Sequence, residues 1–257
     1  METPLVVPHF HAGVRRFGSR ESLSQSAYEM IRDKILRGQY PLGAALSRRQ
    51  LAKELRMSFV PISEALQRLE INGLVESKPR VGTRVRVPTP RDILERYALR
   101  EALETQAARL CVENAHDEGR AEVLRMGRHL DQLYASSTGT DEDFLYSVHT
   151  YHLKFHLRVA EIAGNVLLKE AIQREQVLVF NWLFDTAAHQ RSLPPGFHAQ
   201  LASALAGHSI DAADRAMRAH IRYGMEHTLD ALAALGDSNK WRVQRKALNY
   251  RTGAQSR

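Results

Sequence analysis

The first regular pattern along the chain is that of an amphipathic helix. From Leu23 onward, apolar side chains recur at helical spacing, and the pattern ends at a segment rich in turn-forming residues, 38–43. The apolar face consists of Ala27, Met30, Ile31, Ile35 and Leu36. The spacing therefore predicts one helix over this stretch.

Two shorter helices are predicted next, joined by a tight turn at residues 56–57. Ser47 is placed to cap the first of them, and Ser58 is placed to cap the second, which has Pro61 in its first turn and ends near residues 72–73. The apolar faces of the two helices consist of Leu51, Leu55, Ile62, Ala65, Leu66 and Leu69. Helices connected this tightly are expected to form one compact unit.

A basic β-hairpin is predicted after these helices. Residues 74–77 and 83–87 have the pattern of two short strands. The connection between them consists of Lys78, Pro79, Arg80, Val81 and Gly82. The next segment, 87–90, contains two prolines and cannot easily continue regular structure, so we place a domain boundary there.

Helical periodicity continues almost throughout residues 92–236. The pattern is broken near residues 116–117, 136–140, 164–165, 193–196 and 207–208. These breaks divide the segment into about six or seven helices, and no alternating strand pattern occurs among them. An antiparallel, all-α helical bundle is the economical architecture for such a segment. We therefore expect a mainly α protein.

The distribution of charge distinguishes the predicted domains. Residues 1–90 contain 15 Lys and Arg against 8 Asp and Glu, residues 91–236 contain 15 against 20, and residues 237–257 contain 6 against 1. Neutralisation of phosphates by Lys and Arg drives the binding of nucleic acids. We expect the N-terminal domain, and not the acidic middle, to bind a polyanion.

Cysteine content and hydropathy restrict the cellular setting. The single cysteine, Cys111, cannot form an intrachain disulfide, which fits a reducing cytosol, and any metal site must use His and carboxylates. The N-terminus lacks the apolar run of a signal peptide, and no later stretch approaches the ~18 uncharged apolar residues of a membrane helix. We expect a cytoplasmic protein that does not contact a membrane.

The N-terminal domain has the layout of a winged helix-turn-helix, in which the third helix enters the major groove of DNA and the hairpin touches the backbone or the minor groove. The motifs LSRRQLAKELRMS (46–58) and PISEALQRLEINGLV (61–75) resemble the N-terminal signature of the GntR family over residues 23–87. The resemblance implies that residues 21–88 bind double-stranded operator DNA. Residues 1–20 have no regular period and are expected to form a flexible arm.

Two positions depart from the GntR pattern. The family usually has Arg directly after the capping Ser and another Arg before Glu-Ala-Leu, whereas this chain has Phe59 and Ser63. Because Arg is suited to bidentate contact with guanine, the operator is expected to differ from the family norm. The candidate DNA contacts are Arg49, Ser58, Phe59 (to a thymine methyl), Ser63, Arg68, Arg80 and Gly82. For Arg68, a place on a solvated helix face is an equal alternative.

Several histidines stand at helical spacing in the second domain. His152 and His156 lie at positions i and i+4, which places both imidazoles on one helix face at a spacing suited to a shared metal ion. His198 and His220 lie on the inferred inward faces of later helices. Four histidines from three helices can thus converge inside a bundle. The alternative is an apolar or water-filled pocket without a metal.

Residues 93–234 resemble the FadR-type C-terminal domain (FCD) of the GntR family. The match rests on REALE (100–104), FH (155–156), AGN (163–165) and AADRAM (212–217), together with the His198 to His220 stretch. Many members of that family hold a divalent metal with an Asp four residues before the Phe-His histidine, with that histidine and with two later ones. The resemblance implies the ligands His152, His156, His198 and His220, with His152 at the Asp position.

The change from Asp to His lowers the charge of the ligand set. A site with four histidines favours zinc or nickel over ions that prefer oxygen ligands. His149 lies three residues before His152 and competes for the same role.

The resemblance also implies a small organic acid as effector. Arg100 matches a family position near the pocket and would clamp a carboxylate with two hydrogen bonds. The alternative for Arg100 is a surface ion pair with Glu104 at i+4. Asn181 lies on a long apolar helix and is expected to line the same cavity.

The sequence as a whole predicts a transcriptional regulator rather than an enzyme. We expect a homodimeric repressor on a palindromic operator, with an effector-binding domain at residues 92–236 and a basic tail at 237–257. Two other hypotheses are a repressor for which the metal ion itself is the signal, and a metal-dependent hydrolase in which the histidine cluster activates water. Against the hydrolase, no carboxylate is firmly placed as a general base.

Overall fold

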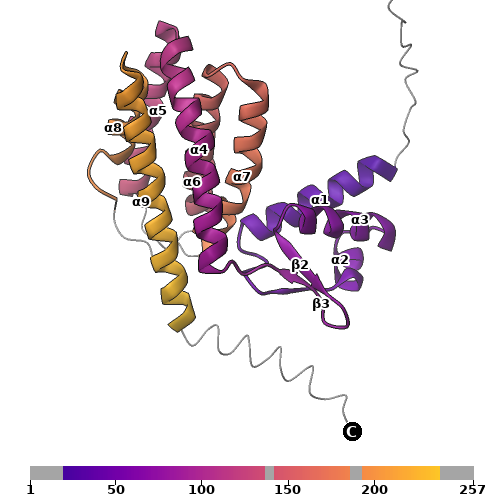
Figure 1. Ribbon diagram of the computed structural model, residues 1–257. Coiled ribbons are helices and arrows are strands. Elements are labelled where there is room, and N and C mark those ends of the chain that lie inside the picture. Colours follow the sequence, from indigo (N-terminus) through magenta and orange to yellow (C-terminus); the bar gives the residue numbers. More distant parts are fainter. Residues whose placement is uncertain (1–19, 137–141, 186–192, 238–257) are drawn as a thin grey trace, which may run out of the picture.

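Two units of different architecture make up the protein (Figure 1). The computed structural model describes residues 20–136, 142–185 and 193–237. The first unit consists of α1 (Arg20–Leu36), β1 (Ala45–Leu46), α2 (Arg48–Glu54), α3 (Phe59–Ile71), β2 (Val75–Lys78) and β3 (Gly82–Val85). The second consists of α4 (Pro90–Asn114), α5 (Asp117–Ser136), α6 (Glu142–Ile162), α7 (Val166–Asp185), α8 (Phe197–Leu205) and α9 (Ile210–Asp237).

The first unit is a winged helix-turn-helix. Its three strands form an antiparallel sheet in the order β1-β3-β2, and α1 packs against α3. The core that joins the helices to the sheet includes the fully buried Ile31, Ile35, Ile62, Leu69 and Leu74. The two predicted strands are confirmed, whereas β1 was not expected, because a strand of two residues is too short to show an alternating pattern.

The helix starts agree with the sequence in part. Ser47 caps α2, since its side chain accepts a hydrogen bond from the Gln50 amide at 3.4 Å. The expectation that the Ser58 side chain caps α3 is wrong, although Ser58 stands at the start of that helix. The third residue of α3 is Pro61, which has no N–H to donate to such a cap. In addition, α1 begins at Arg20, three residues before the apolar pattern.

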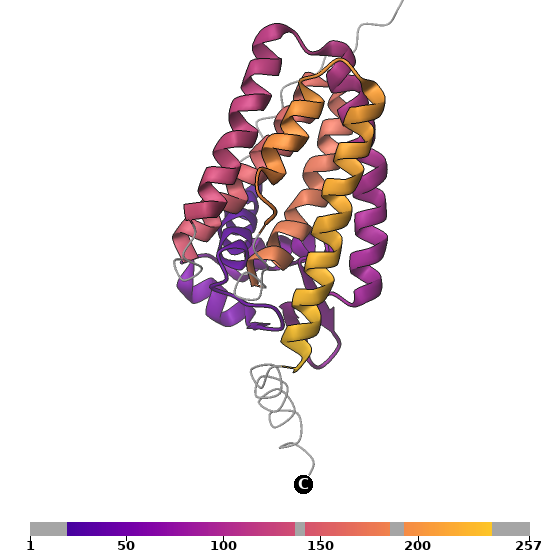
Figure 2. The same ribbon diagram turned by 90° about the vertical axis from the view of Figure 1, so that its left-hand side faces the viewer.

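The second unit is an antiparallel helical bundle (Figure 2). The long helix α4 packs against α9, α6 and α7, while α5 packs against α8 and α6. Within the described residues this unit contains six helices, in agreement with the sequence pattern. The start of α4 is fixed by a capping box, in which Thr89 and Asp92 exchange hydrogen bonds across the first turn, and by Pro90 at the first helical position.

The two units touch through α1 and the helices α6 and α7. The Tyr146 hydroxyl of α6 donates to Asp33 of α1 at 2.9 Å, and the Arg37 guanidinium lies 4.1 Å from the centre of the Tyr146 ring. Figure 1 shows the winged unit beside the lower half of the bundle.

Of the four segments predicted from the sequence, the flexible arm (1–20) and the basic tail (237–257) lie at the ends of the chain. The predicted arm and tail lie outside the described residues, apart from Arg20 and Asp237 at helix ends. Within the described ranges, no helix has the length and apolar character needed to cross a membrane.

Candidate metal centre

Histidines from three helices meet inside the bundle. The Nε2 atom of His156 lies 2.9 Å from Nε2 of His152 and 3.2 Å from Nε2 of His220, and the last two atoms are 3.2 Å apart. His152 and His156 are one helical turn apart on α6, and His220 comes from α9. The three side chains are the group that can share a metal ion within the described residues.

His198 stands beside this group. Its ring centre is 4.9 Å from that of His152 and 5.4 Å from that of His220. The side chain is fully buried, and among the described residues its Nε2 has no hydrogen-bond partner. A buried nitrogen without a partner is costly unless a ligand satisfies it.

Carboxylates hold two of the four rings from outside. Asp131 of α5 accepts from Nδ1 of His198 at 2.9 Å and from the backbone amides of His198 and Ala199 at the start of α8. Glu104 of α4 lies 2.5 Å from Nδ1 of His156. A carboxylate on Nδ1 places the proton there and leaves the Nε2 lone pair free to bind a metal.

The remaining contacts continue this outer layer. Glu104 also accepts from the Arg100 guanidinium at 2.7 Å, and both side chains are buried. The Tyr134 hydroxyl lies 3.3 Å from Nδ1 of His152. From the sequence, Glu104 was expected only as a surface partner of Arg100. Asp131 and Tyr134 were not predicted, since nothing in their spacing links them to histidines far away in the chain.

Burial determines the protonation of the cluster. It lowers the pKa of His198 to about 4, although Asp131 opposes this, and together with the neighbouring histidines it lowers the pKa of His152 and His220 well below the usual value. Burial alone would raise the pKa of Glu104, but Arg100 and His156 lower it to about 2. At neutral pH His152, His198 and His220 are therefore neutral imidazoles, which is the state that binds a cation.

The residues present fit a divalent metal. Zinc binds imidazole nitrogen at about 2.0–2.1 Å, so ligand nitrogens around one ion must lie near one another, as the three Nε2 atoms do. His149, the predicted competitor, is buried nearby, but it is not part of the group of three. Burial lowers its pKa to about 4.

Of the two predicted effector contacts, Arg100 is buried beside the histidine cluster. Arg100 is 5% exposed, so its ion pair with Glu104 is present but is not on the surface as the alternative had it. The guanidinium also lies over the Tyr97 ring, 4.9 Å from its centre. Asn181 lies on α7, and its side chain is outside the described part of the structure.

The predicted DNA contacts lie on two parts of the winged unit. The exposed residues Phe59 and Ser58 stand at the N-terminus of α3, Ser63 is half-buried one turn later, and Arg49 is exposed at the start of α2. Arg80 and Gly82 are exposed in the β2–β3 turn, where both have positive φ angles. Arg68 instead packs against α1, because it donates to Gln25 at 2.7 Å and lies over the Tyr28 ring.

Two family models match the chain. Residues 23–85 match the bacterial regulatory proteins of the gntR family, and residues 95–223, half of the chain, match the FCD domain. This chain is a GntR-family transcriptional regulator with an FCD domain. The resemblance seen in its motifs is thereby confirmed.

Relatives of this GntR regulator agree with that assignment. It is 32% identical to a probable D-xylose utilization operon transcriptional repressor of Paenarthrobacter nicotinovorans, over 60% of this chain and 65% of the relative. It is 26% identical to the HTH-type transcriptional regulator YdhC of Bacillus subtilis, over 78% of this chain and 88% of the relative. A crystal structure of a GntR regulator from Rhodococcus superposes with a TM-score of 0.64 at 25% identity, covering 81% of this chain and 98% of that one.

Proposed function

We propose that this GntR regulator is a homodimeric repressor whose affinity for a palindromic operator is controlled by a small carboxylate bound at the metal centre of its FCD domain. The observation that carries the proposal is the convergence of three Nε2 atoms in the histidine cluster inside the bundle. His152, His156, His198 and His220 would hold the ion, with zinc or nickel preferred by an all-nitrogen ligand set. With four histidine ligands, a carboxylate oxygen of the effector could bind to the ion as a fifth ligand if its coordination number rises above four.

The outer layer of the site prepares it for an anion. Glu104 and Asp131 each hold a histidine ring, so the only carboxylates beside the cluster in the described residues are already engaged. Arg100 adds positive charge behind Glu104, and we propose that it and Asn181 contact the effector. Since neither carboxylate is placed to activate water, the arrangement favours a sensor over a hydrolase.

The winged unit supplies the DNA-binding surface. Phe59 is 57% exposed at the N-terminus of α3, the part of a recognition helix that meets base edges. Arg49 on α2 and Arg80 in the β2–β3 turn are also exposed, as residues that contact phosphates must be. We propose Phe59, Ser58 and Ser63 as base contacts, and Arg49, Arg80 and Gly82 as backbone contacts; Arg68 is the weakest member of the predicted set, because its guanidinium is engaged by α1.

Fluorescence anisotropy on a labelled duplex from the region upstream of the gene tests this function. The zinc-loaded chain is expected to bind the duplex, and one member of a panel of small carboxylates is expected to change the dissociation constant by about 5–150-fold, the usual range of allosteric coupling. Arg49→Ala should weaken binding to all duplexes and reduce the salt slope by about 1, whereas the exposed Arg91→Ala, which is paired with Glu95, should not.

The same titration distinguishes the proposed carboxylate sensor from a repressor for which the metal ion itself is the signal. A change of affinity on adding zinc alone, with no further change from any carboxylate, would make the ion itself the signal. Absence of duplex binding at low salt in every form of the protein would contradict the DNA-binding role.

The contact between Tyr146 and α1 is a route by which the site could act on the DNA-binding unit. Tyr146 lies on α6, the helix that also carries His152 and His156, and its hydroxyl donates to Asp33. Burial and the bond to Asp33 raise the pKa of Tyr146, so the hydroxyl keeps its proton at neutral pH. A movement of α6 on effector binding would therefore pull on α1.

Tyr146→Phe is expected to weaken this coupling. The substitution removes the hydrogen bond to Asp33 and keeps the ring beneath Arg37, so zinc binding should be unchanged while the effector-induced change in operator affinity falls by about 5-fold or more. Paired anisotropy titrations with and without the effector measure it. An unchanged ratio of the two dissociation constants would show that coupling runs elsewhere.

A further inference from the structure

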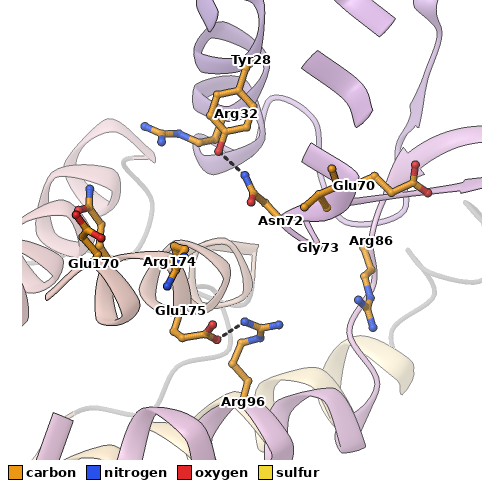
Figure 3. A pocket seen from close by; sticks show the side chains of 12 residues that line it. Tyr28, Arg32, Glu70, Asn72, Gly73, Arg86, Arg96, Glu170, Arg174 and Glu175 are labelled. Carbon is orange, nitrogen blue, oxygen red and sulfur yellow. Dashed lines mark hydrogen bonds and ion pairs between the residues drawn. The ribbon is translucent and has the colours of Figure 1, made fainter. Parts of the chain in front are cut away.

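A second candidate site lies between the two units, away from the histidine cluster. It is a cleft of about 570 Å³. Figure 3 shows that α1 with Tyr28 and Arg32 forms one side, and that α7 with Arg174 and α4 with Arg96 form the other. The volume lies within the usual range of small-molecule sites.

Four arginines line this cleft, and they differ in their partners. Arg96 is paired with Glu175, and Arg86 is paired with Asp92 at 2.5 Å. Arg32 and Arg174 form no ion pair with any described residue. Two guanidinium groups, one from each unit, are thus left without an ion-pair partner in the part of the chain that the structure describes.

Of these two arginines, Arg32 gives the stronger evidence for a ligand in the cleft. Its Nε atom is buried and has no acceptor among the described residues, although the side chain lies near the Tyr28 ring. A buried donor without a partner costs free energy unless a ligand accepts from it. Tyr28 itself is fixed by a hydrogen bond from Asn72 at 2.8 Å, so the wall behind Arg32 is firm.

Two of the three acidic residues of the cleft are engaged with other groups. Glu175 is already bound to Arg96, and Glu70 accepts from the Ser77 amide at 2.8 Å. Glu70 and Glu170 stand at opposite ends of the group in Figure 3. Glu170 lies one helical turn before Arg174 on α7, but no ion pair joins the two side chains, so Arg32 and Arg174 keep donors for an anion.

We infer that this cleft binds a small phosphate-bearing organic molecule through Arg32 and Arg174. A guanidinium group can donate two charge-assisted hydrogen bonds to the oxygens of one phosphate. The two negative charges of a phosphate monoester match the two positive charges of Arg32 and Arg174. A ligand held by both side chains contacts α1 and α7 at once. It changes operator affinity to the extent that it prefers one relative placement of the two units.

Isothermal titration calorimetry of the full chain with ribose 5-phosphate tests the inference, with ribose as the uncharged control. Binding of the phosphate ester and not of ribose is expected. Arg32→Gln and Arg174→Gln should each weaken it by about tenfold or more, the loss expected for a charge-assisted hydrogen bond. Arg91→Gln, on an exposed side chain outside the cleft, should change it by less than about twofold.

Two control measurements test whether the binding belongs to this cleft and whether the variants remain folded. His156→Ala should retain the binding, which separates this cleft from the metal centre and from the proposed function. Arg174 is exposed, so its substitution leaves the fold intact, and a melting curve verifies this. Absence of binding, or equal binding by wild type and both arginine variants, would overturn the inference. So would a loss of operator affinity in Arg32→Gln and Arg174→Gln in phosphate-free buffer, because it would assign these side chains to the DNA backbone.

Discussion

Replacing His156 by alanine is expected to lower zinc affinity by more than about 100-fold, since loss of even an outer partner of a metal ligand typically costs about 10–100-fold. His156 is 2% exposed and lies at the centre of the cluster, with its Nε2 within 3.2 Å of the other two Nε2 atoms. Its removal also leaves Glu104 buried with Arg100 as its remaining charged partner in the cluster. Competition titration with a chromogenic chelator measures the affinity.

His149→Ala is the matched control for this experiment. His149 lies on the same helix and is equally buried, yet it is not in the group that can share an ion. The variant should keep its zinc within a few-fold. A loss equal to that of His156→Ala would make His149 a ligand and would contradict the assignment of four ligands that includes His152.

Replacing Gly127 by alanine is expected to destabilise the bundle by about 1–3 kcal/mol, the usual cost of overpacking. A Cβ at this position of α5 would lie 2.4 Å from Cβ of Ala202 and 2.7 Å from the backbone oxygen of His198. Both atoms belong to α8, so the helix itself must move. This outweighs the gain of about 1 kcal/mol from Gly→Ala in a helix. The movement would also separate His198 from Asp131, and zinc affinity should fall together with stability.

Urea denaturation of the metal-free chain and the same chelator titration give the two readouts. Gly119→Ala, also on α5, is the control, because its Cβ would lie 3.4 Å from Cδ1 of Ile162, the end of a flexible side chain. That variant should be neutral or slightly stabilised, with unchanged zinc affinity. If Gly127→Ala were as stable as Gly119→Ala, the close approach of α5 and α8 would not exist in solution.

The winged unit shows which structural features can be predicted from the local sequence pattern and which cannot. The spacing of Ile31, Ile35, Ile62 and Leu69 was sufficient to predict its helices, because a helix face repeats every three to four residues wherever it packs. The role of Arg68 was undecided between DNA contact and a solvated helix face; the residue is exposed, as the second alternative expects, and its guanidinium also contacts α1. Its partners Gln25 and Tyr28 lie about forty residues earlier in the chain, and helical periodicity does not predict contacts between residues so far apart in sequence.

The histidine cluster shows most clearly what the sequence determines and what only the packing of the helices determines. The sequence by itself predicted an inward position for His152, His156, His198 and His220, since the first two are one turn apart and the motifs around the other two match the FCD domain, but it did not predict that His227 is buried. Only the tertiary structure decided which nitrogens face one another and that Glu104 and Asp131 hold the outer ring nitrogens. It alone also formed the cleft with Arg32 and Arg174. The physical reason is that side-chain periodicity is set by the local backbone, whereas a partner far away in the chain is fixed only when helices pack.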